Sequence, residues 1–154
     1  RCYDNQGNEI RCAGSYQDGE LQTGRAWPTP RFTLEANGVR DHLTGLLWLR
    51  DADLGGLSTW EEALQRVAKL NETRSTHPTW RLPNINELES LVDCARHTPA
   101  LPQEHLFQNV RSAYWSSTSS AFEPDWAWAL YLDKGATGVG QKTGLHFSVW
   151  PCSG

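Results

Sequence analysis

The sequence predicts an α+β domain in which two helices pack on small antiparallel sheets. Two stretches with helical apolar periodicity, residues 58–71 and 84–95, lie before the proline-rich loop that begins near Pro99. Beyond that loop the chain consists of short apolar segments separated by turn residues, which is typical of antiparallel strands. The length of 154 residues suits a single hydrophobic core.

The first part of the chain is turn-rich. We expect residues 1–36 to form an ordered but irregular N-terminal arm, with Trp27 and Phe32 as anchors, and residues 37–154 to form the core of one domain, 1–154. Residues 39–43 and 46–49 flank Thr44-Gly45, a pattern typical of a hairpin in which glycine supplies the positive φ.

The two helices carry start signals. Ser58 and Glu61 form a predicted capping box before the first helix, and Asn84 with Glu87 forms one before the second. The predicted buried stripes consist of Trp60, Ala63, Leu64, Val67 and Ala68 in the first helix, and of Ile85, Leu88, Leu91 and Val92 in the second. The proline-rich stretch 77–83 between them is expected to cross as an extended segment.

Four segments after the proline-rich loop are predicted strands: residues 112–118, 125–133, 136–142 and 144–150. Strand side chains alternate between the two faces of a sheet. One face of the second strand is therefore expected to carry Trp126, Trp128, Leu130 and Leu132.

Charge and hydropathy exclude two classes of partner. The chain has 14 Lys and Arg against 18 Asp and Glu, a net charge of −4, and its arginines are scattered, so the clustered basic footprint of a nucleic-acid-binding protein is absent. The sequence contains no run of 18 apolar residues, so it predicts no membrane span. A chain that starts at Arg1 and lacks methionine is expected to have lost a leader.

The four cysteines, Cys2, Cys12, Cys94 and Cys152, allow three pairings. A Cys2–Cys12 bond would close a small loop rich in turn residues, and a Cys94–Cys152 bond would close a long one. We expect disulfides and hence an extracytoplasmic location. The alternative is four buried thiols in a cytosolic protein.

Catalytic and metal motifs are weak. The sequence contains no HExxH, no GxSxG and no GxxxxGK[ST] motif, so we expect no enzyme and no cofactor. His97 and His105 share the proline-rich loop, but scattered exposed histidines are the commoner case. Calcium is considered only because Asp41, Asp51 and Asp53 supply carboxylates, although without the regular spacing of an EF-hand loop. We expect no metal site.

The tryptophans suggest a binding role. Five of the eight, Trp48, Trp60, Trp80, Trp115 and Trp128, are expected in the core. Trp126, Trp150, Tyr114 and Tyr131 are less clearly buried, and an exposed aromatic ring beside polar side chains is suited to stacking on a sugar. The alternative, that all eight tryptophans are buried, stays open.

Several motifs occur in an order that resembles a known family. These are "VRDHLTGLLWLRDA", "TWEEAL", "WRLPNINELESLVD", "YWSST" and "DWAWALYLDKG", preceded by the cysteine-containing arm. Together they resemble the Lcl C-terminal domain family, catalogued on bacterial secreted and surface proteins and named for a Legionella collagen-like adhesin. The resemblance implies a C-type-lectin-like fold, in which Cys94 and Cys152 would clamp the final strand.

The motif positions carried over are interpreted mainly as architecture: Trp48, Trp80, Arg81, Glu87 and Trp115. Arg81 and Glu87 are expected to pair beneath the start of the second helix. The chain departs from the family where it ends in "VWPCSG" instead of a basic "VRCVR", which weakens any transfer of polyanion binding.

The expected function is a secreted or cell-surface, non-catalytic binding module that recognises a glycan or other surface ligand. The candidate ligand-binding residues lie in or near the loop 119–125 and the following strand and turn: Phe122, Asp125, Trp126, Tyr131 and Asp133. The alternative is a structural subunit of an extracellular assembly, whose partners would be neighbouring subunits or further copies of the chain.

Overall fold

The computed structural model describes residues 1–73 and 78–154. The predicted extended crossing at 77–83 begins outside the described residues at His77, and from Pro78 to Pro83 the chain contains no helix. The architecture is α+β with small antiparallel sheets, as the sequence predicts.

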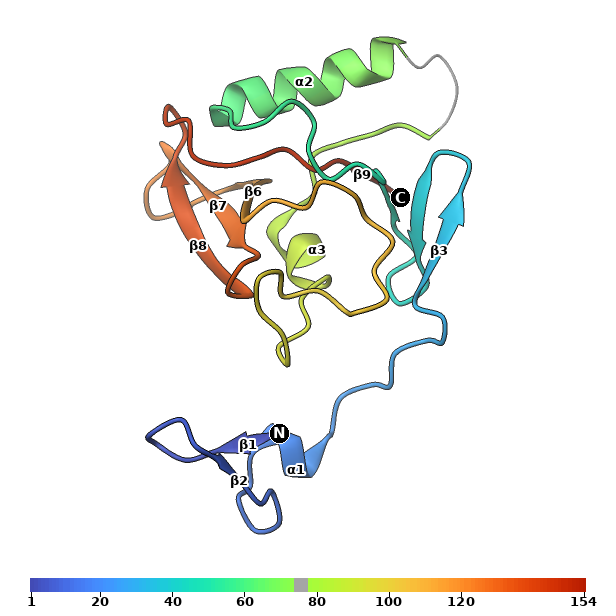
Figure 1. Cartoon of the computed structure of the whole chain (residues 1–154). Helices are drawn as coiled ribbons and strands as arrows, with labels where there is room; N and C mark the ends of the chain where they lie inside the picture. Colours follow the sequence, from blue (N-terminus) through green and yellow to red (C-terminus); the bar gives the residue numbers. More distant parts are fainter. Residues whose placement is uncertain (74–77) are drawn as a thin grey trace.

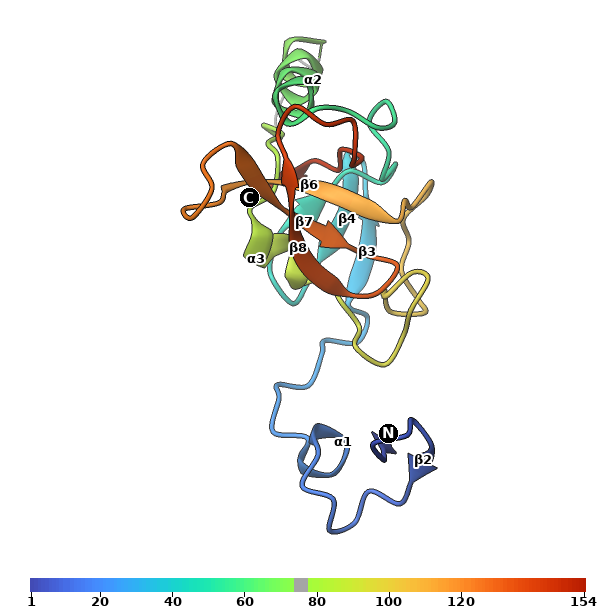
Figure 2. The same ribbon diagram turned by 90° about the vertical axis from the view of Figure 1, so that its left-hand side faces the viewer.

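Two sheets form the core and a third lies in the arm. The four-stranded sheet has the order β3-β4-β5-β9, the three-stranded sheet the order β6-β7-β8, and β1 pairs with β2. Figures 1 and 2 show α3 between the two larger sheets, α2 along one side of the core, and the arm on the opposite side. The bounds are β1 Cys2–Tyr3, β2 Glu9–Ile10, α1 Asp18–Leu21, β3 Phe32–Glu35, β4 Gly38–Asp41, β5 Leu47–Trp48, α2 Trp60–Thr73, α3 Ile85–Glu89, β6 Ala113–Ser119, β7 Trp126–Tyr131, β8 Ala136–Gln141 and β9 Cys152–Ser153.

The predicted hairpin is formed by β4 and β5, with Val39 opposite Trp48 and Gly45 at φ +78° in the turn. A second hairpin, β3–β4, begins within the segment that the sequence placed in the irregular arm. Phe32 accounts for this hairpin, because its buried ring packs edge-on against Phe107, with 5.2 Å between the ring centroids, and anchors β3 to the core. The arm proper therefore precedes β3.

The capping box of α2 lies one residue later than predicted. The Glu62 N–H donates to Thr59 Oγ1 at 3.2 Å, and the Thr59 N–H donates to Glu62 Oε2 at 3.0 Å. Ser58 does not cap, because it is buried and its N–H is bonded to the Phe147 carbonyl. Of the predicted stripe, Ala63 and Val67 are buried, Trp60 and Leu64 are partly buried, and Ala68 is exposed.

The second of the two predicted helices, α3, starts where predicted but is shorter. Asn84 and Glu87 form the expected capping box. The helix ends at Glu89, and the Ser90 hydroxyl donates to the Glu87 carbonyl at 2.6 Å, a local bond that competes with helix continuation. Leu91 is still fully buried, but it occupies a turn.

The expected Arg81–Glu87 pair is present beneath α3. Arg81 Nη1 and Nη2 donate to the Glu87 carboxylate, at 2.7 and 2.6 Å. The bond from Arg81 holds the pKa of Glu87 below its usual range, opposed by burial and supported by the Asn84 N–H. The pair's contribution to stability is therefore present above the ordinary glutamate pKa and is lost as the pH falls through the depressed value.

The core contains aromatic residues from both larger sheets and from the segments beside them. Trp48, Trp80, Trp115, Trp150 and Tyr114 are all fully buried. The Trp150 ring contacts the rings of Trp48, Phe107 and Tyr114 at centroid distances of 5.3, 4.6 and 5.1 Å. The prediction that Trp128 belongs to the core is wrong, because 37% of it is exposed.

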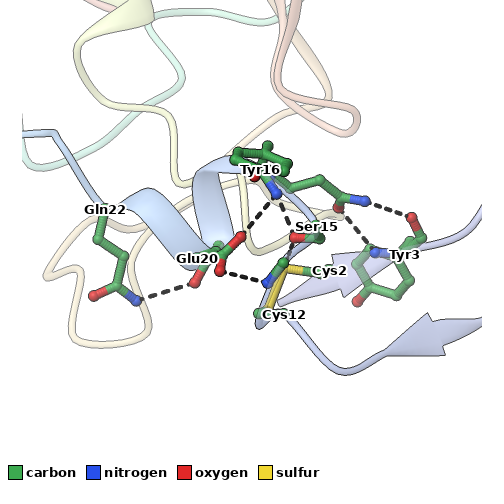
Figure 3. The surroundings of a disulfide bond; sticks show 10 residues. Cys2, Tyr3, Cys12, Ser15, Tyr16, Glu20 and Gln22 are labelled. Atoms are coloured by element: carbon green, nitrogen blue, oxygen red, sulfur yellow. Dashed lines mark hydrogen bonds between the residues drawn. A yellow bond between two sulfur atoms is a disulfide. The ribbon is translucent and has the colours of Figure 1, made fainter.

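The arm is held by one disulfide and a set of polar contacts (Figure 3). Cys2 and Cys12 are bonded, as one of the predicted pairings has it. The Glu20 carboxylate accepts the N–H groups of Gly14 and Tyr16, and these bonds lower its pKa. No arm residue belongs to the core cluster in the part of the chain that the structure describes.

The predicted Cys94–Cys152 disulfide is wrong. Cys152 lies opposite Trp48 in β9 and is fully buried, with its Sγ 3.9 Å from Glu87 Oε2. Cys94 is exposed in the turn after α3 and lines a cavity beside the arm. The pairing fails because β9 is held inward by its bonds to β5 and to Arg81, while Cys94 is exposed and shares a cavity with arm residues.

The two free thiols are expected to differ sharply in reactivity. Burial raises the pKa of Cys152 to about 12, so its thiolate is scarce at neutral pH, whereas Cys94 is solvent-exposed. A maleimide added to the native, unreduced protein should label Cys94 alone, and labelling in denaturant should add Cys152; intact mass and peptide mapping measure both. A Cys94→Ser variant is the control and should take no label when native. Equal native labelling of both cysteines would contradict the assignment.

Candidate functional site

Two tryptophans project from the same face of β7. Trp126 is half-buried and Trp128 is 37% exposed. Their cross-strand neighbours in β8 are Gln141 and Val139. Leu130 shares this face but is fully buried. The predicted alternation is thus correct, but only one end of the face is covered.

The candidate ligand-binding residues do not all come together. Phe122, 92% exposed, and Asp125, also exposed, lie in the loop that leads to Trp126. Tyr131 is at the other end of β7 on the opposite face, with its ring edge-on to Phe147 at 5.4 Å. Asp133 follows in the turn beyond, where its N–H donates to the Ser112 carbonyl. A single site made of all five residues is not formed.

Lys142 fastens the loop 119–125 to the rest of the domain. Its ammonium group donates to Ser119 Oγ at 2.7 Å and to the Pro124 carbonyl at 2.8 Å, and it lies 4.3 Å from the centroid of the Trp60 ring. The Trp126 N–H donates to the Glu123 carbonyl. The loop beside Trp126 is therefore held by several hydrogen bonds.

We name the outward face formed by Trp126, Trp128, Val139 and Gln141 the tryptophan face.

The carboxylates considered for calcium each have another partner. Asp41 is fully buried against Arg31, Asp53 is paired with Arg111 at 2.8 Å, and Asp51 accepts the Asn109 amide. Within residues 1–73 and 78–154, no group of three or more His, Cys, Asp or Glu side chains is arranged to hold a metal ion.

A second candidate lies between the arm and the core. Three adjacent cavities of about 450, 310 and 510 Å³ all have Arg96 in their walls. The first two also share Pro102 and Gln103, and the last two share Ala95 and His97. We call this run of cavities the Arg96 trough. Figures 1 and 2 show the loop of residues 93–105 projecting from the core toward the arm, so that both contribute walls.

His97 and His105, weighed above as metal ligands, both line the middle cavity of this trough. Burial lowers the pKa of His105, which favours its neutral form at pH 7. Its ring stacks on Phe107 at 6.0 Å. The histidines therefore contribute to a polar cavity wall.

The family model of the Lcl C-terminal domain matches residues 37–153. The chain belongs to this family. No curated protein and no solved structure is detectably similar to it. The Lcl family is associated with secreted and surface proteins of bacteria.

Within the Lcl domain the carried-over motif residues are architectural. Trp48, Trp80 and Trp115 are fully buried, and Arg81 with Glu87 supports the start of α3. The arm and β3 precede the matched segment, so the Arg96 trough combines Lcl-domain residues with residues outside the match. No described helix combines the length and the apolar composition needed to cross a bilayer.

Sequence reasoning missed Arg96 and assigned Trp27 only an anchoring role. The available signal was the pair of proline-rich stretches, "WPTP" at 27–30 and "HTPALP" at 97–102. Proline lacks an N–H, so such stretches remain as loops with free surface. Nothing in the spacing indicated that these two loops meet.

Proposed function

We propose that the protein is a secreted or cell-surface, non-catalytic module that recognises a glycan through the tryptophan face. The observation that carries the proposal is the pair Trp126 and Trp128, which share one face of a paired strand while remaining incompletely buried. Four other tryptophans, Trp48, Trp80, Trp115 and Trp150, are by contrast completely buried.

The surroundings suit a polyhydroxylated ligand. A sugar stacks its apolar C–H face on an indole ring, and its hydroxyls need polar partners at the edge of that ring. Gln141 lies directly opposite Trp126, and Asp125 precedes it. The bonds of Lys142 hold the adjacent loop, which reduces the ordering cost on binding.

The extracytoplasmic location is part of the same proposal. Disulfides persist in oxidising compartments, and the Cys2–Cys12 bond is of this kind. The association of the Lcl family with bacterial surface proteins supports it. We also propose that the fold resembles that of C-type lectins, which likewise combine two helices with small antiparallel sheets.

A glycan array probed with the oxidised protein, with and without calcium, tests the proposal. Trp126→Ala and Trp128→Ala are expected to weaken a saturable signal about tenfold or more, as truncation of an aromatic hot spot does. Tyr16→Ala is the matched control, because this ring is 83% exposed but lies in the arm. A signal unaffected by either tryptophan variant, or no signal from folded protein, would refute the tryptophan face as a glycan site.

One observation favours a structural subunit as the second candidate. The large apolar side chains of the arm stay accessible: Tyr3 is 45% exposed, Ile10 39%, Tyr16 83% and Leu21 53%. Such side chains are typical of a surface covered by another subunit. Sedimentation velocity separates the candidates: a single 17.3 kDa species at high concentration would speak against self-assembly through the arm.

A further inference from the structure

We infer that the Arg96 trough is a separate binding site for an uncharged oligosaccharide chain, and that the arm forms one of its walls. The inference rests on the glycan recognition proposed above, but it concerns different residues. None of the residues of the tryptophan face lines the trough.

The shape favours an extended ligand. The cavity at one end is bounded by Trp27, Pro28 and Pro30 of the linker between arm and core. The cavity at the other end is bounded by Tyr3 and Gln17 of the arm. The middle cavity, of about 310 Å³, joins them along Arg96 and His97. Each end cavity falls within the size range of small-ligand sites, so the run accommodates several linked units.

The charges favour a ligand without net charge. The basic residues of the lining are Arg1, Arg31 and Arg96, and the acidic ones are Asp18, Asp93 and Glu104. Arg31 is further neutralised by Asp41, and Arg96 lies 3.5 Å from Asp93. A polyanion would meet three carboxylates in this lining. A hydroxyl both donates and accepts hydrogen bonds, and so suits guanidinium and carboxylate groups alike.

Aromatic rings are present at both ends. The Trp27 ring lies 4.4 Å from the Arg31 guanidinium carbon, and Trp27 remains 40% exposed. Arg31 is itself fixed by two bonds to Asp41, at 3.1 and 3.0 Å, so the ring rests on a rigid support. At the other end, the Tyr3 N–H donates to Gln17 Oε1 at 3.0 Å, and Gln17 Nε2 donates to the Tyr3 carbonyl at 2.8 Å. Both rings suit stacking on sugar units.

Two buried nitrogen atoms of the lining residues are unpaired. Arg31 Nη1 and His105 Nδ1 have no hydrogen-bond partner among the described residues. Both residues line the trough. A buried polar group without a partner costs free energy. Because protein atoms cover both nitrogens, a ligand oxygen would pair with them only after lining side chains move.

The test uses the full oxidised chain on an array of neutral oligosaccharides, including β-1,4-glucan, α-1,4-glucan, mannan and chitin series, with heparin as the polyanion. A glycan bound in the trough should lose about tenfold or more of its affinity in both Trp27→Ala and Tyr3→Ala, because each removes a stacking ring. Its affinity should be retained in Trp128→Ala and in Tyr16→Ala. Longer members of the series should bind more tightly than the disaccharide.

Three results would overturn the inference, and they separate it from the proposed function. Neutral glycans whose binding depends on Trp128 but not on Trp27 or Tyr3 would leave the tryptophan face standing and remove the trough. Binding of heparin alone would contradict the neutral ligand class. Silence across the array, with the protein shown to be folded, would refute both. A Trp27→Tyr variant, which keeps a ring over Arg31, should retain most of the affinity and guards against a misfolded alanine variant.

Discussion

Replacing Arg31 with methionine is expected to destabilise the protein by about 3–5 kcal/mol, because it leaves the Asp41 carboxylate buried without its counter-charge. Arg31 and Asp41 are 6% and 0% exposed, and two hydrogen bonds join them. Arg31 also donates to the Ser90 carbonyl at the end of α3, so the pair links the β3–β4 hairpin to α3. Urea unfolding followed by circular dichroism measures the change.

The control for this prediction lies in the same hairpin, β3–β4. Arg40 and Glu35 form an exposed pair in which the side chains are 31% and 41% accessible, and Glu35→Gln should cost no more than about 1 kcal/mol. Asp41→Asn should be nearly as destabilising as Arg31→Met. The double variant should recover part of the loss, because no isolated buried charge remains. A loss from Arg31→Met as small as that from Glu35→Gln would contradict the role assigned to the pair.

Replacing Trp150 with alanine is expected to cost about 3–5 kcal/mol, the range for truncating a large aromatic residue in a well-packed core. Its ring is fully buried, contacts three other aromatic rings, and donates to the Leu49 carbonyl at 2.8 Å. The variant therefore creates a cavity and also leaves a buried carbonyl without its partner. Thermal and urea unfolding should both report the loss.

The comparison variants are Trp150→Phe and Trp128→Ala. Phenylalanine preserves much of the packing but not the bond to Leu49, so it should be intermediate. Trp128 is 37% exposed and its removal should cost clearly less than that of Trp150. Equal stability of the two alanine variants would show that the assignment of Trp150 to the core and of Trp128 to the surface is wrong.

Local signals predicted local structure well. The Thr44-Gly45 turn, the Asn84–Glu87 capping box and the alternation along β7 are all confirmed, because each depends on residues close together in the chain. The capping box of α2 was misplaced by one residue, since Ser58 and Thr59 are both N-cap residues with a glutamate three positions on, and Ser58 is instead buried and bonded to Phe147.

Long-range pairing was not predictable in the same way. Two cysteines separated by a small turn-rich loop, Cys2 and Cys12, were paired correctly as one option. Cys94 and Cys152 were expected to pair, although no sequence signal specifies how β9 lies relative to the turn after α3. The candidate site is a different case: its five residues were grouped by their nearness in the chain, although the alternation along a strand already places Trp126 and Tyr131 on opposite faces of β7.

The sequence by itself determined the α+β class, the membership in the Lcl family and the local capping and turn geometry, because these follow from periodicity, motifs and short-range hydrogen bonds. Only the tertiary structure decided which tryptophans are covered. Trp128 and Leu130 lie on the same face of β7, yet Trp128 is 37% exposed and Leu130 is fully buried. Only the tertiary structure, too, brings the linker with Trp27 beside the loop with Arg96, because burial and cavities arise where segments distant in the chain meet.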